Sequence, residues 1–305
     1  MNVACGMLDY PSLSALAAVV REGSFERAAR ALSVTTSAVS QRVKLLEDRL
    51  GTVLVIRGRP CVPTDIGRVL CRHFEQVAML EQDLRSELPK LAQGLLQGGS
   101  PAIRLAVNAD SLGTWFVGAV SKFLECETVL LDIVLDDQEH TLEWLRSGDV
   151  LAAVTVTPRA IQGCNSVPLG RLRYIAAASP GFMGRYFPDG VNSTSVANAP
   201  TINFNRKDLL QAEWIRRVCG RQVDTPVHWL PSTHGSIEAA IAGIGWAMHP
   251  AVLVRAHLRA GTLVELVPGR KLSVPLYWQY ARLEAPALTR LTRAIVAAAR
   301  KSLPE

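Results

Sequence analysis

Cysteine is scarce and widely spaced in this chain of 305 residues. Because no two cysteines lie closer than ten residues, the sequence contains neither a CxxC redox motif nor a zinc-binding pair. The six cysteines are Cys5, Cys61, Cys71, Cys126, Cys164 and Cys219. We expect them to be reduced and mostly structural, although a redox sensor would arise if the fold brought two of them together.

Sequence motifs typical of catalysis are missing as well. GxSxG, HExxH and GxxxxGK[ST] do not occur, and the GxGxxG pattern that starts at Gly243 and Gly245 has Met248 in its third glycine position. His228, His234, His249 and His257 lack metal-ligand spacing. The sequence therefore predicts no enzyme, no catalytic residue, no metal site and no cofactor.

An export signal and a membrane-spanning run are not apparent either. The first residues lack a basic start followed by an apolar stretch. The most apolar long run, residues 239–254, is interrupted by two glycines, His249 and Pro250, and is too short to cross a bilayer. We expect a cytoplasmic protein without membrane contact, in which this run is a buried helix that leads into a strand.

The size and charge of the chain fit a two-domain protein with a polyanionic partner. A length of 305 residues suggests about two domains, and 49% hydrophobic residues can supply a sizeable core. The net charge of +6 and the isoelectric point of 9.2 are milder than a purely electrostatic binder would show. Selective binding through a few contacts is the better fit.

Residues 24–57 contain two short amphipathic helical patterns separated by a tight turn. Ser24 suits the N-cap of the first helix, Thr35 or Thr36 begins the second, and Gly51 suits its C-cap. The second helix is predicted to bury the stripe Val39, Val43, Leu46 and Leu50. An isolated helical hairpin with a polar face would show the same pattern, so the flanking sequence decides between the two interpretations.

The flanking sequence favours a DNA-binding winged helix-turn-helix. Residues 13–20 predict a preceding helix that can cover the pair, and residues 53–62 alternate like a wing around a turn at Gly58 to Pro60. Segment 35–59 holds five cations and two acids, which favours phosphate contact. Hydroxyls, amides and cations suit base edges and phosphates. The predicted DNA-binding residues are Ser24, Thr35, Thr36, Ser37, Ser40, Gln41, Arg42, Lys44, Arg57 and Arg59.

This segment resembles the DNA-binding domain of LysR-type transcriptional regulators. FERAARALSVTTSAVSQRVKLLEDRLG followed by LVIR matches helix, turn, recognition helix and wing in order. AVNADSLGTWF, the segment around Asp136 and Asp137, and VPLYWQ resemble the arginine- and lysine-responsive branch of that family, often called ArgP or LysG. Thr36 departs from the family, where a glutamine often bonds an adenine in two places.

The resemblance implies a set of partners. It implies a double-stranded DNA operator, arginine or lysine as co-effector, control of an amino acid exporter gene, and a homodimer or homotetramer, with RNA polymerase as a further candidate partner. A LysR-type regulator of another small-molecule or redox signal stays open as an alternative.

A long helix is predicted to begin at Thr64 or Asp65. Its narrow apolar stripe consists of Ile66, Leu70, Phe74, Val77, Leu80 or Glu81, Leu84 and Leu88. Packing on its own domain would explain this stripe, but a charged helix with little nearby sequence to cover it more naturally pairs with a second copy. We expect a dimer whose recognition helices read half-sites one or more helical turns, about 34 Å, apart. Residues 89–101 are the predicted hinge.

Short apolar strands alternate with helices after residue 102, which is typical of α/β folds. The predicted strands are 103–107, 129–135, 151–156, 173–178, 201–204, 227–230, 246–249 and 275–280. The resemblance implies a periplasmic-binding-protein-like domain with two lobes around a ligand cleft and chain crossings near 156–173 and 266–275.

The predicted fold class is α+β multidomain. It comprises a winged helix-turn-helix (1–63), a linker and dimerisation helix (64–92) and a two-lobed effector-binding domain (93–305), with lobe I at about 101–165 and 272–305 and lobe II at about 166–271. A solute-binding protein shares the two-lobed fold but has no use for residues 1–90.

Polar loops after three strands are the candidate effector site, because ligands gather at strand ends in open α/β sheets. Amides and hydroxyls after the first strand suit a carboxylate, although Asp110 or Ser111 could only cap the helix. The acids after the second strand suit a guanidinium or ammonium. His234 stands where the branch is expected to have an acid, which favours a neutral or larger ligand if it faces the site. The predicted effector-binding residues are Asn108, Asp110, Ser111, Thr114, Trp115, Asp136, Asp137, Ser232, Thr233 and His234.

Overall fold

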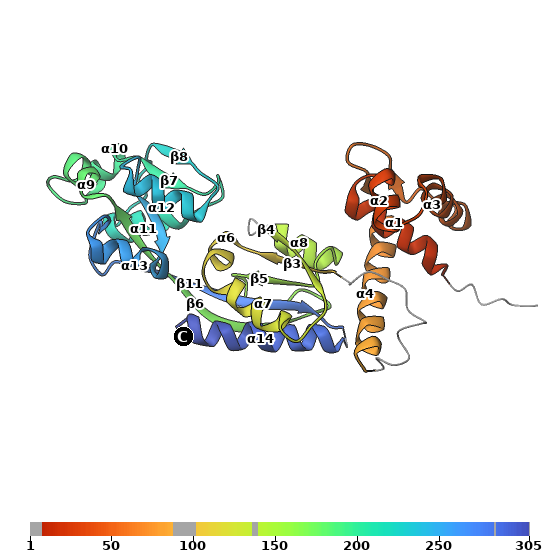
Figure 1. Cartoon of the computed structure of the whole chain (residues 1–305). Coiled ribbons are helices and arrows are strands. Elements are labelled where there is room, and N and C mark those ends of the chain that lie inside the picture. The colour runs from red at the N-terminus through yellow and green to blue at the C-terminus, as the bar shows by residue number, and fades with distance from the viewer. Residues whose placement is uncertain (1–7, 88–101, 136–139, 284, 305) are drawn as a thin grey trace, which may run out of the picture.

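The amino-terminal part folds as a helical domain with a small hairpin. The computed structural model describes residues 8–87, 102–135, 140–283 and 285–304. The domain consists of α1 (Tyr10–Glu22), α2 (Phe25–Ala31), α3 (Thr36–Leu50), β1 (Val55–Ile56) and β2 (Val62–Pro63) (Figure 1). β1 and β2 pair antiparallel, as expected of a wing.

The ends of these helices follow the predicted capping chemistry. The Ser24 hydroxyl accepts a hydrogen bond from the Arg27 amide at 3.4 Å, and the Thr35 hydroxyl accepts one from the Ala38 amide at 3.2 Å. Gly51 ends α3 with a φ of 65°, a conformation that favours glycine. Both predicted N-caps and the C-cap are therefore confirmed.

The buried stripe of α3 is one turn shorter than predicted. Val39, Val43 and Leu46 are at most 2% exposed and pack against α1, but Leu50 is 42% exposed. Leu50 occupies the last position of the helix, immediately before the Gly51 cap, where its side chain lies outside the core of the domain. The prediction that Leu50 is a core residue was wrong.

Helix α4 (Asp65–Glu87) joins the two parts of the molecule. The Thr64 hydroxyl accepts a hydrogen bond from the Gly67 amide at 3.1 Å, which fits the predicted start. Leu70, Cys71 and Phe74 pack on the amino-terminal core, whereas Ile66 and Leu80 are 49% and 44% exposed. The predicted stripe is therefore divided between a packed face and an open face. The Leu84 side chain, Leu88 and the predicted hinge at 89–101 lie outside the described residues.

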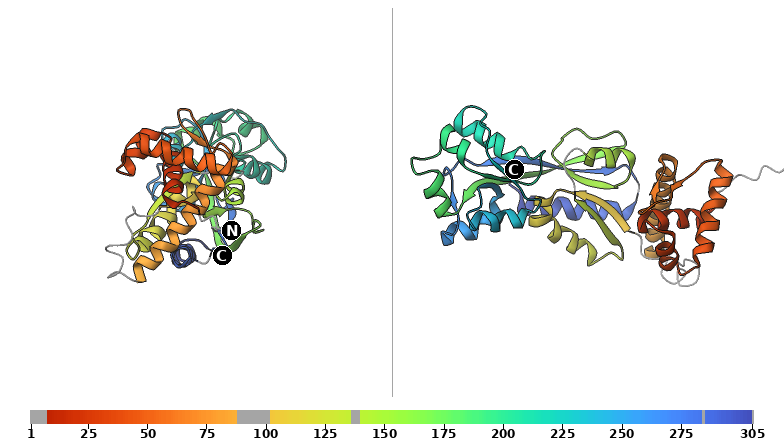
Figure 2. Two further views of the ribbon diagram at one scale, coloured as in Figure 1. Left: turned by 90° about the vertical axis from the view of Figure 1, so that its right-hand side faces the viewer. Right: turned by 90° about the horizontal axis from the view of Figure 1, so that it is seen from above.

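The remaining chain forms two α/β lobes that lie side by side (Figures 1 and 2). Lobe I contains β3 (Ala102–Val107), α6 (Ala109–Ser111), η1 (Leu112–Phe116), α7 (Val117–Leu124), β4 (Leu130–Leu135), α8 (His140–Ser147), β5 (Ala152–Thr155) and α14 (Pro286–Ser302). Lobe II contains α9 (Pro180–Tyr186), α10 (Ser193–Asn198), β7 (Thr201–Asn203), α11 (Leu210–Cys219), β8 (Val227–Trp229), α12 (Thr233–Ile241), β9 (Ala247–Pro250), α13 (Ala251–Ala260) and β10 (Val264–Glu265).

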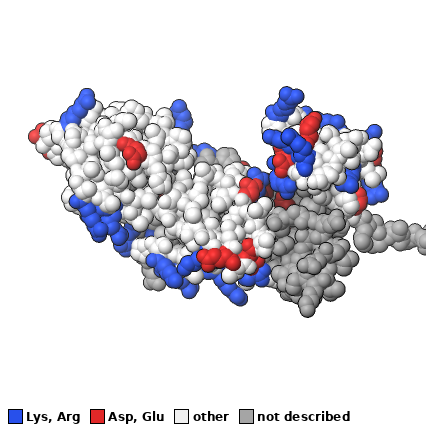
Figure 3. Space-filling view, viewed as in Figure 1, with Lys and Arg blue, Asp and Glu red and all other residues white. Residues whose placement is uncertain are grey.

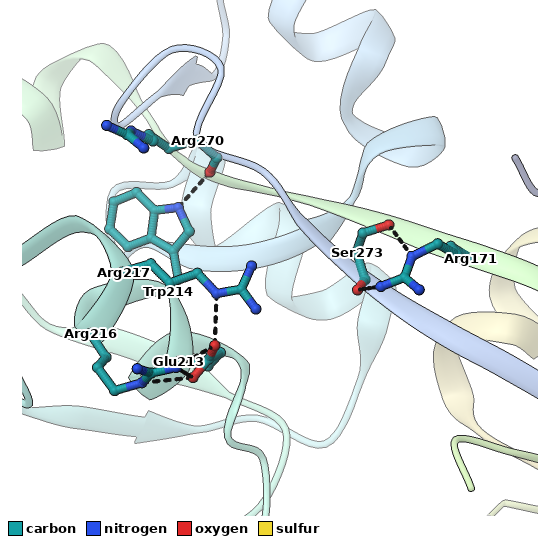
Figure 4. Close-up of polar contacts among 7 residues, drawn as sticks. All are labelled: Arg171, Glu213, Trp214, Arg216, Arg217, Arg270 and Ser273. Carbon is teal, nitrogen blue, oxygen red and sulfur yellow. Dashed lines mark hydrogen bonds and ion pairs between the residues drawn. The ribbon is translucent and has the colours of Figure 1, made fainter. Parts of the chain in front are cut away.

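Two long antiparallel strands, β6 (Cys164–Ala178) and β11 (Leu272–Ala281), run from one lobe into the other. The sheet order is β10-β6-β11-β5-β3-β4, with β9 also paired to β6, so both lobes share these strands. The Arg171 guanidinium in β6 donates to the Ser273 hydroxyl at 3.1 Å and to the Ser273 carbonyl at 2.8 Å, which ties the strands together at the crossing (Figure 4).

The long strand β6 corrects the prediction of a strand confined to 173–178. Asn165, Pro168, Gly170 and Arg171 make residues 164–172 resemble a loop, but these residues pair with β11 along the crossing. Tertiary pairing therefore overrides local strand propensity here. The other predicted strands lie within three residues of observed ones.

Each part of the molecule has its own hydrophobic core. The amino-terminal core contains α1, α2, α3 and the wing, while the largest core lies between the shared sheet and its helices. In lobe II, the Trp214 indole donates a hydrogen bond to the Arg270 carbonyl at 2.6 Å (Figure 4). Glu213 pairs with Arg216 and Arg217 on the surface of α11, where ion pairs contribute little stability.

Candidate DNA-binding surface and interlobe effector site

The outward face of α3 is open to solvent. Thr35, Thr36, Ser37, Gln41 and Lys44 are exposed, and Ser40 and Arg42 are partly buried. The apolar side of the same helix packs beneath this face, so the helix is anchored while its polar groups stay available. This is the arrangement that a recognition helix needs in a major groove.

The wing stands beside the recognition helix and carries two exposed arginines. The Arg57 guanidinium lies 4.9 Å from the centre of the Phe25 ring, and Arg59 sits in the turn between β1 and β2. The Cys61 amide donates to the Gly23 carbonyl at 2.9 Å, which fixes the wing against the end of α1. Figure 3 shows Lys and Arg side chains gathered on the amino-terminal domain. Exposed cations are the groups that suit phosphate contacts, and such contacts set a protein's register on DNA.

The loop after β3 begins the candidate effector site. The Asn108 side chain accepts a hydrogen bond from the Ser111 amide at 2.7 Å, and the Thr114 hydroxyl donates to the Asp110 carbonyl at 2.6 Å. Both side chains therefore shape the start of the helix. The residues that follow form η1, a π-helical segment, and such segments are frequent at functional sites.

Asp110 joins the two lobes. Its carboxylate accepts a hydrogen bond from the Thr233 hydroxyl of α12 at 2.6 Å and another from the Tyr174 hydroxyl of β6 at 2.8 Å. We call these three residues the Asp110 cluster. Burial raises the pKa of Asp110, although the two hydrogen bonds oppose that shift. Burial and the neighbouring carboxylate raise the pKa of Tyr174 well above its usual value.

The amino-terminal end of α12 approaches the same place from lobe II. The Ser232 hydroxyl accepts a hydrogen bond from the Gly235 amide at 3.0 Å and caps the helix. A Cβ atom on Gly113 would lie 3.1 Å from the Cε1 atom of His234, so the imidazole packs closely over this glycine. His234 is exposed and its imidazole reaches lobe I, so it lies at the contact between the two lobes.

Other predicted residues take different places. The Trp115 ring is 5% exposed and packs in the core against Phe116, so its side chain is part of the core and not of an open site. Asp136 and Asp137 lie outside the described residues. Of the predicted set, the structure therefore brings together Asp110, Thr233 and His234, with Ser111 next to Asp110.

Sequence reasoning missed two residues near this junction. Tyr174 lies inside a strand and has no local signal, since its role depends on the crossing of β6. Asp208 follows β7, and its charge raises the pKa of both Asp110 and Tyr174. Applying the strand-end argument to β7 would have found Asp208.

Two buried polar groups near the strand ends lack partners within the described part of the chain. They are the Ser111 hydroxyl, which follows Asp110, and the Asn203 side-chain oxygen at the end of β7. Buried polar groups are normally paired, so these atoms are suited to bind a ligand or water.

Cys61, Cys71, Cys126, Cys164 and Cys219 are free thiols. Within the described ranges, no cluster of His, Cys, Asp or Glu could hold a metal ion. Of the helices in these ranges, none is long and apolar enough to span a membrane.

Comparison with known proteins agrees with this geometry. Residues 11–68 match the model of the bacterial regulatory helix-turn-helix protein, lysR family, and residues 96–303 match the LysR substrate binding domain. The chain is 43% identical over 293 residues to the HTH-type transcriptional regulator ArgP of Pseudomonas aeruginosa, with 96% of each chain covered.

Two solved structures are similar over almost the whole length. ArgP from Mycobacterium tuberculosis is 41% identical, with 98% of this chain and 99% of that chain covered and a TM-score of 0.78. LysG from Corynebacterium glutamicum with bound effector Arg is 37% identical, with 98% and 100% covered and a TM-score of 0.69. The predicted regulator is confirmed in place of an enzyme, because these relatives regulate transcription: the chain belongs to the LysR family of DNA-binding transcriptional regulators and to its ArgP/LysG branch.

Proposed function

We propose that this regulator senses a basic amino acid, arginine or lysine, between the two lobes of its effector domain. In this proposal the bound amino acid changes how the protein engages its operator, and the controlled gene encodes an amino acid exporter. The effector acts by binding one arrangement of the lobes better than another.

The Asp110 cluster is the observation that supports this proposal. Burial raises the pKa of the Asp110 carboxyl, which has no charge partner among the described residues, and an ammonium or guanidinium group would supply one. Each oxygen of an ionised carboxylate can accept more than one hydrogen bond, so Asp110 has capacity beyond Tyr174 and Thr233. A cationic ligand is therefore favoured over a neutral one of the same shape.

Other groups at the junction suit the opposite end of an amino acid. The Ser111 hydroxyl has no partner among the described residues, and the α12 start presents amides beside Ser232. Hydroxyls and helix N-terminal amides suit an α-carboxylate. The effector-bound LysG structure adds support, because a relative over the full chain holds arginine.

A calorimetric titration with L-arginine, L-lysine and L-citrulline tests the proposal. Citrulline has nearly the shape of arginine, but its side chain is uncharged. We expect arginine or lysine to bind at least tenfold more tightly than citrulline. Equal binding of arginine and citrulline, or no binding of either basic amino acid, would overturn the proposed effector and favour the neutral ligand that His234 suggests.

Asp137 is proposed as a second contact for the cationic end. Asp137→Asn should weaken arginine binding without changing operator affinity measured in the absence of arginine. Asp224→Asn, which changes an exposed acid of lobe II, is the matched control. Equal titration heats for wild type and Asp137→Asn would remove Asp137 from the site.

The remaining parts of the proposal concern assembly and partners. Residues 1–63 bind the operator, 64–92 dimerise and 93–305 bind effector, and two dimers can form a tetramer that engages RNA polymerase in the cytoplasm. The exposed apolar residues Ile66, Val69 and Leu80 of α4 support pairing with a second copy. Val69→Glu should therefore yield monomer by sedimentation, and an unchanged dimer would disprove pairing through this face.

A further inference from the structure

Helix α4 is anchored in both functional parts of the molecule. Cys71 is 8% exposed in the core of the DNA-binding domain, and Met79, two turns later, is 1% exposed in the main core of the effector domain. A continuous helix transmits a displacement of one anchor to the other because its backbone hydrogen bonds keep it stiff. Motion of lobe I at Met79 therefore reaches the helix-turn-helix through α4.

Arg72 makes a polar contact between these two anchors. Its Nη1 atom donates a hydrogen bond to the Ser147 carbonyl at the last residue of α8. The carboxyl end of a helix carries partial negative charge, which favours a guanidinium there. Arg72 thus holds the end of α8 against the side of α4.

The turn after α8 is shaped to receive Arg72. Gly148 has a φ of +74°, and a Cβ atom on it would overlap Arg72 Cδ and lie 2.7 Å from Arg72 Nη1. Any other residue would strain the turn and push the arginine away. Glycine is therefore required here both for its backbone conformation and for the space that it leaves.

Helix α8 connects this contact to the effector side of lobe I. It begins at His140, after β4, and spans eight residues, or about 12 Å. Leu145 packs with Ala106 and Ala153 of the neighbouring strands, so α8 is held on the sheet. A change at its amino-terminal end can shift the Ser147 carbonyl.

An open pocket lies between the two domains near Arg72. A cavity of about 400 Å³ lies beside the Arg72 contact and is lined by α1, α2, the wing, α4 and lobe I. One direct contact between the domains, that of Met79 in the effector-domain core, lies outside this pocket. The Arg72 contact is another, and Arg72 itself lines the pocket.

We infer that Arg72 is the residue that couples effector binding to DNA binding, by joining the end of α8 to the linker helix α4. The inference rests on the proposed function, because an effector must move α8. Arg72 touches neither DNA nor effector in this scheme. Instead, Arg72 determines how strongly bound effector changes the affinity of the protein for its operator.

The test compares wild type, Arg72→Met, Gly148→Ala and the control Arg68→Met, whose arginine pairs with Asp65 of its own helix. Duplex DNA selected for tight binding from a random pool serves as operator, and its affinity is measured with and without saturating L-arginine. Arginine binding is measured separately by calorimetry. Coupling between sites typically changes affinity 5- to 150-fold.

We expect Arg72→Met and Gly148→Ala to bind arginine and DNA as wild type does, but to lose the effect of arginine on DNA affinity to within about twofold, while Arg68→Met keeps it. Full coupling in Arg72→Met would overturn the inference. If Gly148→Ala does not fold, the comparison of Arg72→Met with wild type still tests the inference.

A second measurement separates failure of the inference from failure of the proposed effector. If wild type does not bind arginine, the proposed function fails, and hydrogen exchange of residues 140–147 with and without the selected DNA then tests Arg72. Exchange that responds to DNA in wild type but not in Arg72→Met supports the coupling. No response in wild type, or the same response in both proteins, overturns it.

Discussion

The DNA-binding surface and the interlobe junction use similar polar residues, but they differ in exposure to solvent and in how far apart these residues lie in the sequence. On α3 the polar groups come from neighbouring positions in the sequence. They lie on one face of the helix that is open to solvent. At the junction, Asp110 meets Tyr174 and Thr233, which are 64 and 123 residues away, and Tyr174 and Thr233 are buried while Asp110 is partly buried. A surface site therefore needs only a folded helix, whereas the junction needs the whole effector domain.

The two regions also differ in how their charged groups interact with a partner. Exposed cations like those of α3 and the wing attract polyanions through solvent, and salt screens this attraction. Asp110 acts at short range in a buried place, where one unpaired charge is costly. Substitutions at the junction should therefore have larger effects than single substitutions on the DNA-binding surface.

Asp110→Asn should have the largest effect. Loss of the buried charge should weaken arginine binding about 100-fold, or about 3 kcal/mol, because truncating one side of a buried charge pair removes the partner of the cation. Calorimetry measures this, with Asp224→Asn as the control. Operator affinity without arginine should stay within twofold, and a loss of less than threefold in arginine affinity would show that Asp110 is only structural.

Between the two regions, Glu75 of α4 gives a pH-dependent effect. Burial raises its pKa from 4.5 to about 7, opposed by Arg104 and Arg21 and assisted by Asp132 and Asp149. The folded state therefore binds more protons than the unfolded state between these values, so stability falls as pH rises through this window.

Between pH 5.5 and 7.5, the free energy of unfolding of wild type should fall by about 2 kcal/mol more than that of Glu75→Gln, because glutamine does not titrate. Urea unfolding at both pH values measures the difference. Identical pH dependence in wild type and Glu75→Gln would mean that Glu75 titrates normally.

On the DNA-binding surface, Arg42→Ala should weaken operator binding about tenfold, or about 1.4 kcal/mol, and reduce the salt slope by about one. Fluorescence anisotropy at several salt concentrations measures both quantities, and the exposed Arg255→Ala of lobe II is the control. Arginine binding should not change. An unaltered salt slope would remove Arg42 from the DNA interface.

The smallest effect concerns the end of the recognition helix. Leu50→Ala should change the free energy of unfolding by less than about 0.5 kcal/mol, because the side chain is 42% exposed. Leu46→Ala, in the same stripe but 2% exposed, should cost about 2 kcal/mol or more. Equal losses in urea unfolding would place Leu50 in the core after all.

The same contrast explains what the sequence could predict. The helices, caps and wing of the DNA-binding domain follow from local spacing, and three of the four residues in the α3 stripe are buried as expected. The prediction for Leu50 was wrong because periodicity does not reveal how far along α3 the core of the domain extends. In the effector domain most strands could be predicted, but the long β6 crossing depends on pairing with β11.

The effector site could be predicted only in part, for the same reason. Asp110, Ser111 and Thr233 follow strands and were found from that position, whereas the strand residue Tyr174 joins them only through the crossing. The second lobe also determines which residues cap a helix and which residues face a ligand. Asn108 and Ser232 are helix caps in the structure.

A crystal structure of this chain with L-arginine tests the central claim most directly. The account predicts arginine between the lobes, with its ammonium or guanidinium about 2.7 to 2.9 Å from the Asp110 carboxylate and His234 at the contact between the lobes. Arginine bound away from the junction, or an Asp110 carboxylate still contacted only by Tyr174 and Thr233, would contradict it.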